Sequence, residues 1–153
     1  MSITARLADL RVTLPDAPAP AANYLPYVTI GKLVHVSGQL PNGPEGLVLG
    51  KLGDTLGAEA GAAAARLCAI SLLSQVKAAC GGDIERLVRV VKLTGFVNST
   101  GEFADQPKVI NGASDLMYEV FGDVGKHARS AVGVPVLPLD AAVEVDAIVA
   151  LKA

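Results

Sequence analysis

Apolar positions along the chain first gather in two short β-branched runs within YVTIGKLVHVSGQLP, residues 27–41. Its two β-branched halves flank Gly31 and Lys32, which predicts a tight β-hairpin. The preceding residues include the Pro/Ala-rich run PDAPAPAANYLP, so we expect residues 1–22 to form an extended N-terminal segment. The chain therefore begins its regular structure with two neighbouring strands.

The pattern then changes to a helical period in TLGAEAGAAAARLCAISLLSQVKAAC, residues 55–80, where apolar residues recur along one buried stripe. The Val-rich residues 85–98 predict a strand, and residues 101–123 predict a second helix. Two final strands are expected over residues 129–136 and 142–151, separated by the turn LPLD. The many alanines of the first helix would let it lie close to a sheet.

The predicted element order is β-β-α-β-α-β-β in one domain covering residues 1–153. This order favours an α+β fold with both helices on one face of a mixed or antiparallel sheet. Apolar residues make up 51% of the chain and charged residues 18%. We therefore expect another subunit to cover the second face of the sheet.

Charge and aromatic content argue against nucleic acid as a partner. The net charge is −2, and the chain has no Trp, three Tyr and three Phe, too few for a base-stacking surface. We find no apolar run near the roughly 18 residues needed to span a bilayer, so no membrane association is expected. The first 20 residues carry charges throughout and lack the apolar core of a signal peptide, which predicts a cytoplasmic protein.

Several common sites are excluded by spacing. Cys68 and Cys80 lie about 18 Å apart along one predicted helix, too far for a disulfide within a subunit, so they are expected to be buried thiols. Two isolated His and two helical Cys have no zinc-site spacing, and no metal site is predicted. The Gly-rich residues 42–54 do not match a phosphate loop, because Leu52 stands where Ser or Thr is required.

Candidate chemistry is confined to the C-terminal strands. Arg129 begins an otherwise apolar strand, while Glu144 and Asp146 share one face of the last strand, about 6.6 Å apart. The two acids could form a solvated polar face, and Arg129 could pair with one of them across the sheet. Alternatively, the guanidinium of Arg129 binds a small carboxylate or phosphate through its bidentate fork.

The segments NYLPYVTIGKLVHVSGQLP and HARSAVGVPVLPLDAAVEVDAI together resemble the RidA/YjgF family, formerly called endoribonuclease L-PSP, in its longer branch of roughly 150 residues. The resemblance implies a chorismate-mutase-like fold and a homotrimer with an inner barrel and clefts between subunits. It also implies hydrolytic deamination of 2-iminopropanoate or 2-iminobutanoate to a 2-keto acid and ammonia. A protonated imine is already electrophilic, so no cofactor or metal is expected.

The same resemblance implies roles for single residues. Arg129 matches the family arginine that binds the substrate carboxylate, and Glu144 matches the glutamate that holds the attacking water. Tyr24 matches the tyrosine that lines the cleft. Ser37 and Gly38 match the strand end beside the ligand.

Two positions depart from the family pattern and leave the substrate open. Ala131 stands where many deaminases have Cys, and the family Asn of the second helix corresponds to Asn111 or Asp115. The alternatives to a deaminase are a non-enzymatic protein that binds small carboxylates such as keto acids, an endoribonuclease or translation inhibitor, and a structural trimer. A ribonuclease would need a basic track for phosphates, which the net charge disfavours.

Overall fold

The structure, a computed structural model, describes residues 1–19 and 22–153. Its main feature is a five-stranded sheet made of β1 Tyr27–Ile30, β2 Leu33–Gln39, β5 Leu87–Asn98, β6 Ala128–Val134 and β7 Val143–Leu151. The strands follow the order β1-β2-β7-β5-β6 across the sheet, and β5 and β6 run parallel while the other neighbours are antiparallel. The predicted mixed sheet is therefore confirmed, with β6 at one edge.

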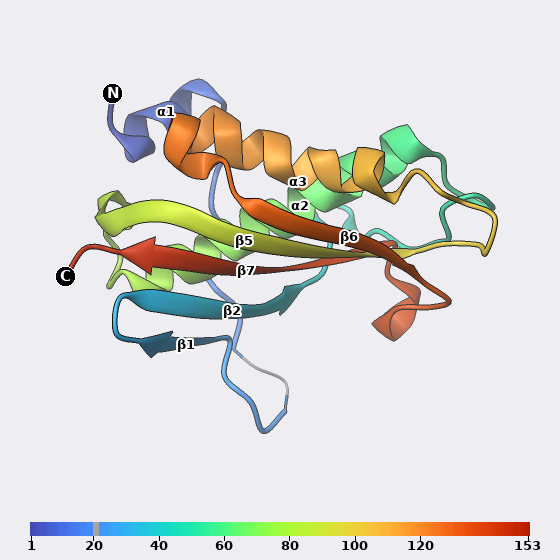
Figure 1. Cartoon of the computed structure of the whole chain (residues 1–153), viewed down its shortest axis with the longest axis horizontal. Helices are drawn as coiled ribbons and strands as arrows, with labels where there is room; N and C mark the ends of the chain where they lie inside the picture. The colour runs from blue at the N-terminus through green and yellow to red at the C-terminus, as the bar shows by residue number, and fades with distance from the viewer. Residues whose placement is uncertain (20–21) are drawn as a thin grey trace.

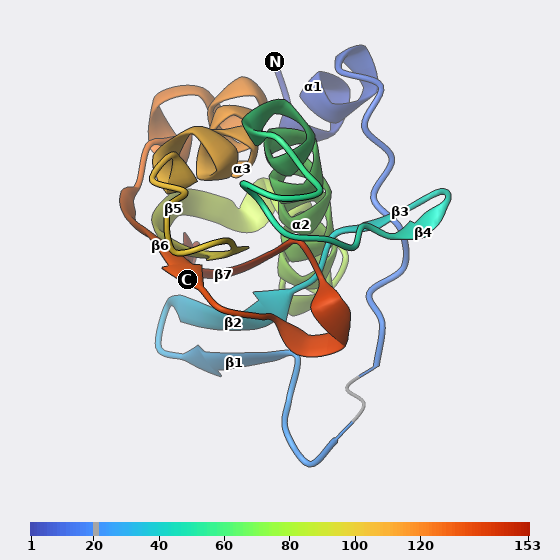
Figure 2. The same ribbon diagram turned by 90° about the vertical axis from the view of Figure 1, so that its right-hand side faces the viewer.

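Two helices, α2 Ala58–Ala79 and α3 Gln106–Phe121, lie on the same face of this sheet. Figure 1 shows them stacked along the strands, and the end view in Figure 2 places both on one side of the sheet. This arrangement confirms the α+β class with helices on one face. One face of the sheet is therefore packed against the two helices, and the other face is not covered by them.

Strand β7 has the predicted alternation. The side chains of Val143, Val145, Ala147 and Val149 are buried toward the helices, while the intervening residues are half-buried. Opposite them, α2 buries its small residues Ala64, Ala65 and Ala69, which allow the close approach expected from its composition. Cys68 and Cys80 are buried free thiols, as predicted, and burial raises the pKa of both.

The second face of the sheet carries exposed apolar side chains. Val28, Ile30 and Val132 keep 51%, 68% and 45% of their surface exposed in the single chain. By strand register, Val28 and Ile30 lie on the side away from the buried Val34 and Val36. These exposed apolar side chains are the ones that the predicted cover by another subunit would bury.

The N-terminal segment differs from the prediction, because residues Ile3–Asp9 form helix α1. Ser2 caps this helix by accepting a hydrogen bond from the Ala5 N–H, and the Glu85 carboxylate accepts from the N–H groups of Ile3 and Thr4. These contacts come from a residue far along the chain. The rest of the segment has no regular structure in its described part, and Pro20 and Ala21 of the predicted extended stretch lie outside the described residues.

Some boundaries also move. Helix α3 begins at Gln106 rather than near residue 101, because Thr100 and Phe103 close a turn first and Pro107 favours the first turn of a helix. The short elements that were not predicted are β3 Asn42–Gly43, β4 Gly46–Leu47, η1 Ile84–Arg86, η2 Gly122–Gly125 and η3 Pro138–Asp140. Of these, η2 matters for the site because it leads into β6.

Helix α2 corrects one further expectation. By length and composition alone it is apolar enough to cross a bilayer, although no such run was expected. Its many alanines raise the mean hydropathy, and half of the tested window is buried inside the protein. The core helix of a folded domain meets the same criterion, so this property is weak support for a membrane span.

Candidate functional site

Arg129 lies near the start of edge strand β6 and points toward α3. Its register partner on β5 is Leu93, which is buried against the helices, so Arg129 shares the helix-covered face of the sheet. Its Nη1 donates to Asn111 Oδ1 at 2.8 Å and to Ser114 Oγ at 3.2 Å. Two residues one helical turn apart therefore hold one end of the guanidinium.

This geometry tests one of the two sequence-based interpretations, the salt bridge across the sheet. Arg129 makes no ion pair with Glu144 or Asp146, nor with another acid of the described chain. The alternative of a cross-sheet salt bridge is therefore wrong for the single subunit, because the two acids lie on the other face. The remaining N–H groups of the guanidinium are available to a ligand.

Of the two second-helix residues left open by the sequence, Asn111 contacts Arg129 directly. Asp115 lines the pocket beside Arg129 without a hydrogen bond to it. This pocket has a volume of about 430 Å³ and is lined by Ser114, Asp115, Tyr118, Lys126, His127 and Arg129. Lys126 and Arg129 carry positive charge in this pocket, and Lys126 Nζ already pairs with Asp123 Oδ1 at 3.1 Å, so Arg129 is the cation best placed for an anionic ligand.

Two residues of this pocket were not expected from the sequence as functional. Ser114 Oγ lies 2.9 Å from His127 Nε2, and His127 Nδ1 lies 2.6 Å from the Gly125 carbonyl oxygen. Burial, and then the charge of Arg129, lower the pKa of His127, so the ring is neutral near pH 7. The only signal in the sequence was that His127 precedes Arg129 by two residues and so shares its side of the strand.

Ala131 follows Arg129 on the same face of β6 and is partly buried against the core. Where the family pattern has a thiol, this chain therefore has a packing methyl group. Ala131 is not among the residues that line the pocket of Arg129, and its side chain has no polar atom to offer a ligand.

Glu144 belongs to a different environment on the open face of the sheet. Its register partner on β5 is Phe96, and Asp146 lies on the same face opposite Thr94. Burial, together with the nearby charge of Asp146, raises the pKa of Glu144 above its ordinary value. A carboxylate with a raised pKa is better suited to accept a proton near neutral pH.

Gly38 makes room for Glu144. A Cβ atom at position 38 would lie 2.7 Å from Glu144 Oε2, so any side chain there would displace the carboxylate. Ser37 Oγ donates to the Leu25 carbonyl at 2.7 Å and ties the end of β2 to the preceding loop. Tyr24 in that loop is half-exposed and shares a small cavity of about 60 Å³ with Ser37 and Gly38.

The structure thus divides the predicted residues into two groups. Tyr24, Ser37 and Gly38 gather near Glu144, whereas Asn111 and Ala131 gather near Arg129. Strand β5 separates β6 from β7, and Arg129 is level with Ala147, three residues from Glu144, so their Cα atoms lie about 14 Å apart. The two groups also face opposite sides of the sheet, and one subunit does not join them.

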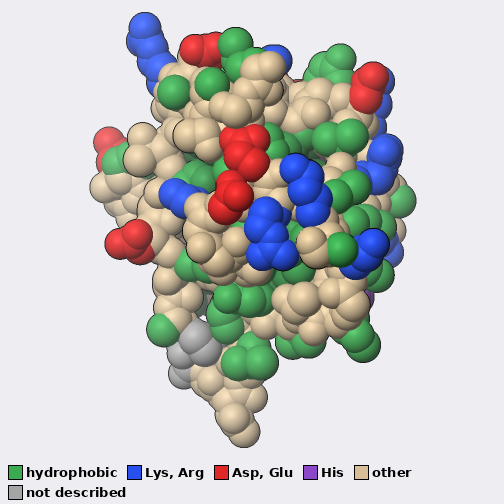
Figure 3. Space-filling view, turned by 90° about the vertical axis from the view of Figure 1, so that its left-hand side faces the viewer, with side chains coloured by type: hydrophobic (Ala, Val, Ile, Leu, Met, Phe, Trp, Pro, Cys, Tyr) green, Lys and Arg blue, Asp and Glu red, His purple; other side chains and the backbone are tan. Residues whose placement is uncertain are grey.

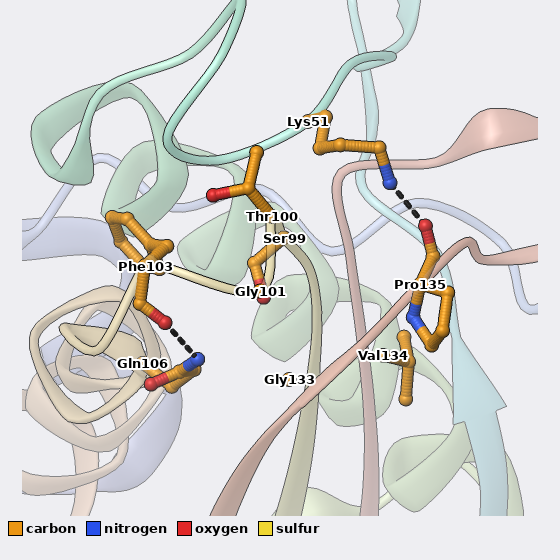
Figure 4. A pocket seen from close by; sticks show the side chains of 9 residues that line it. All are labelled: Lys51, Ser99, Thr100, Gly101, Phe103, Gln106, Gly133, Val134 and Pro135. Carbon is orange, nitrogen blue, oxygen red and sulfur yellow. Dashed lines mark hydrogen bonds between the residues drawn. The ribbon is translucent and has the colours of Figure 1, made fainter.

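A second pocket of about 530 Å³ lies at the other end of β6, next to the Gly-rich loop (Figure 4). Its cation, Lys51, donates to Asn98 Oδ1 at 2.6 Å and to the Pro135 carbonyl. The Gln106 amide donates to the Phe103 carbonyl at 2.7 Å. Because these donors already have partners, the pocket is less suited to an anion than the pocket of Arg129, and Lys51 is not a phosphate-loop lysine.

Surface charge adds no sign of a nucleic-acid track on the face drawn in Figure 3. Acidic and basic side chains lie next to each other in its middle, so that face has no patch of one sign. Within the described residues, no group of three or more His, Cys, Asp or Glu is placed to hold a metal ion.

Comparison with known proteins agrees with this fold. Residues 4–151 match the family described as "YjgF/chorismate_mutase-like, putative endoribonuclease". The chain belongs to the YjgF/RidA family. It is 54% identical to Protein TCP17 of Trypanosoma cruzi over 152 residues, which is 98% of this chain and 94% of that protein.

Two solved structures share the fold of this chain. Atu1372 from Agrobacterium tumefaciens, of unknown function, is 48% identical, with 98% of this chain and 92% of that chain covered and a TM-score of 0.91. E. coli TdcF, solved with bound serine, is 25% identical, with 90% and 94% covered and a TM-score of 0.60. The chorismate-mutase-like fold predicted from the sequence is confirmed.

Proposed function

We propose that this YjgF/RidA protein hydrolyses small 2-imino acids, such as 2-iminopropanoate and 2-iminobutanoate, to 2-keto acids and ammonia. The reaction would take place in a cleft between two copies of the chain within a homotrimer. The observation that carries the proposal is the placement of Arg129 and Glu144 on opposite faces of the sheet, about 14 Å apart. A site that uses both needs Arg129 from one copy and Glu144 from the next.

Arg129 would bind the substrate carboxylate. Asn111 and Ser114 both accept from Nη1, which leaves the Nε and Nη2 edge of the guanidinium for a bidentate contact. The pocket beside it also contains Lys126 and is large enough for a three- or four-carbon acid. Serine bound in the structure of TdcF is a ligand of the same size with the same carboxylate.

Glu144 would act as the general base for the attacking water. Its raised pKa lets the carboxylate take a proton as water attacks C2 of the protonated imine, forming the C–O bond of a carbinolamine. The same proton then passes to the amino nitrogen. As the C–N bond breaks and the C=O bond forms, the hydroxyl proton returns to Glu144, and ammonia leaves with the 2-keto acid as product. The partly buried position beside Gly38 would hold the carboxylate in place during these transfers.

The open face of the sheet supports the assembly part of the proposal. Val28, Ile30 and Val132 are exposed apolar residues on strands, and their burial between subunits would stabilise an oligomer by roughly 25 cal/mol for each Å² removed from water. Glu144 lies on this same face. An interface formed there would bring Glu144 to the boundary between copies.

The family description also names endoribonuclease activity, but the observations favour it less. Cleavage of RNA needs a track of basic groups for phosphates. The chain carries a net charge of −2, and among the described residues the pocket beside Arg129 brings together three basic groups, Lys126, His127 and Arg129. A pocket of this size fits a small acid better than a polynucleotide.

A coupled assay tests the proposal. An amino-acid dehydratase that uses serine generates 2-iminopropanoate, and pyruvate formation is followed with and without this protein. We expect the protein to accelerate pyruvate release above the spontaneous rate, and Arg129→Ala to abolish most of the acceleration. An unchanged rate with a folded oligomer that still binds pyruvate would assign the chain to non-enzymatic keto-acid binding instead, and RNA cleavage would favour the endoribonuclease.

A further inference from the structure

The hydrogen atoms around Ser114 can be placed from the chemistry of its partners. The Gly125 carbonyl can only accept, so His127 Nδ1, 2.6 Å away, must carry the ring proton of the neutral histidine. Nε2 then carries no hydrogen, and its lone pair can accept a hydrogen bond. The hydrogen bond of 2.9 Å between Ser114 and His127 therefore runs from the serine hydroxyl to Nε2.

Arg129 fixes the other side of Ser114. A guanidinium can only donate, so Ser114 Oγ accepts from Nη1 at 3.2 Å and keeps its own hydrogen for His127. The hydroxyl is thus placed between a base that can take its proton and a cation that stabilises the resulting alkoxide. A nucleophile, a base and a group that orients the base are the parts of an activated serine.

The backbone around the pair is arranged to hold it. Gly125 ends the 3-10 turn η2, and a Cβ atom there would collide with the Met117 carbonyl of α3. Only glycine permits this approach, which brings the carbonyl of residue 125 to the imidazole. Ser114 and His127 also line the pocket of about 430 Å³ beside Arg129, so a ligand in the pocket can reach Oγ.

We propose that Ser114 and His127 form a nucleophile–base pair that gives this pocket a second activity, the transfer of acyl groups from small activated esters that carry a carboxylate. The carboxylate would be attracted by Arg129 and Lys126. This activity uses neither the 2-imino acid nor Glu144. It therefore goes beyond the proposed deamination.

The proposed acyl transfer takes place in two steps, acylation of Ser114 and hydrolysis of the acyl-serine. Ser114 Oγ attacks the acyl carbon, its proton moves to His127 Nε2, and the C–O bond to the leaving alcohol breaks as that alcohol takes the proton. Water then attacks the acyl-serine, gives one proton to His127 and releases the acid, and the proton returns to Ser114. Because Arg129 Nη1 donates to Ser114 Oγ, the guanidinium would lie near the oxyanion that forms on the acyl carbon in both steps.

The test is covalent labelling with phenylmethylsulfonyl fluoride, followed by digestion with trypsin and mass spectrometry. In labelling, the Oγ–S bond forms, the S–F bond breaks, and the proton leaves through His127 with fluoride. Trypsin cuts after Lys108 and Lys126, and the peptide between these sites contains Ser114 as its only serine. We expect the mass of the sulfonyl group on this peptide.

Three variants sharpen the result. Ser114→Ala should lose the label, and His127→Gln should slow labelling by about 100-fold because glutamine cannot act as the base. Ser130→Ala is the matched control, since Ser130 is an exposed serine of the same strand on the other face, and it should label like the parent. A circular-dichroism melt of each variant confirms that it is folded.

A pH profile separates a working base from a structural hydrogen bond. The titratable and charged groups around His127 are Arg89, whose side chain donates to the Lys126 carbonyl, Asp123 of η2, which pairs with Lys126, and Asp115, Tyr118, Lys126 and Arg129 of the pocket. Burial lowers the pKa of His127, so the labelling rate should stay constant as pH falls past about 6.5 and drop only below it. In His127→Gln the drop should disappear.

The result of the labelling test does not depend on the result of the deamination assay. Labelling at Ser114 that depends on His127, together with hydrolysis of 4-nitrophenyl hydrogen succinate, supports the pair even if no imine is hydrolysed. No label on the peptide of the folded parent, a label on Tyr118, or an unchanged rate in His127→Gln would overturn it. Deamination could still stand in each of those cases.

Discussion

Arg129 and Glu144 lie on neighbouring parts of one sheet but in contrasting surroundings. Arg129 is held by side chains of α3, Asn111 and Ser114, on the helix-covered face. Glu144 lies on the open face, where the absence of a side chain at Gly38 gives it room and burial raises its pKa. The first environment fixes a donor for an anion, and the second prepares an acceptor for a proton.

The contrast teaches why a single subunit is incomplete. A carboxylate next to the guanidinium would be neutralised by it, its pKa would fall, and it would be a poor base. With the two groups on opposite faces, each keeps the charge state that its role needs until a ligand lies between two copies. Mutations on the two sides should therefore have different consequences.

The largest expected effect comes from Glu144→Gln. Removal of a general base costs about 10²–10⁴-fold in turnover, while pyruvate binding should change little because the carboxylate is held elsewhere. Steady-state kinetics and pyruvate titration by calorimetry measure the two quantities. A variant that loses pyruvate binding to the same extent as turnover would contradict the separation of roles.

Arg129→Ala should act on binding. Loss of a charged hydrogen bond costs about 1.5–3 kcal/mol, which weakens pyruvate binding roughly 10–150-fold. Arg129→Lys keeps the charge without the fork and should fall between the parent and Ala. If the Ala variant binds pyruvate like the parent, Arg129 only connects β6 to α3 and is not the anion site.

Gly38→Ala should have a smaller effect, on turnover alone. The added methyl group would lie 2.7 Å from Glu144 Oε2 and would move the carboxylate, so we expect turnover to fall about tenfold. Gly101→Ala is the matched control, because a Cβ atom there meets nothing within 4 Å. Equal losses in the two variants would show that Gly38 does not position Glu144.

The smallest effect concerns stability and pH. The folded-state pKa of Glu144 is raised, so the folded state holds this proton more tightly than the unfolded state does. Its contribution to stability is present below the unfolded pKa of about 4.3 and is lost as pH rises through the folded value. Urea unfolding should therefore show a smaller loss of stability between about pH 4 and pH 7 in Glu144→Gln than in the parent. An equal loss would mean that Glu144 titrates normally.

The sequence was sufficient for features that depend on local period. The alternation in β7 predicted both its buried face and the half-buried face that carries Glu144, and the alanines of α2 predicted its close packing on the sheet. Helix α1 could not be predicted in this way. Its first N–H groups are satisfied by Glu85, a contact between segments more than 80 residues apart.

The grouping of the site residues was beyond the sequence for a related reason. Which face Arg129 occupies relative to Glu144 depends on the register of β6 and β7 against β5 between them, and no local pattern encodes that register. The contact of Ser114 with His127 depends on the turn η2, which was not predicted. The contact of Asn111, rather than Asp115, with Arg129 likewise depends on the orientation of α3.

A mixed-subunit experiment tests most directly whether the site is shared between copies. Arg129→Ala and Glu144→Gln chains are unfolded together in equal amounts and refolded, and imine hydrolysis is compared with each variant refolded alone. If each site takes Arg129 from one copy and Glu144 from the next, random assembly leaves about one quarter of the sites intact, with about one quarter of the parent's turnover. Activity of the mixture no greater than that of the separate variants would contradict the shared site.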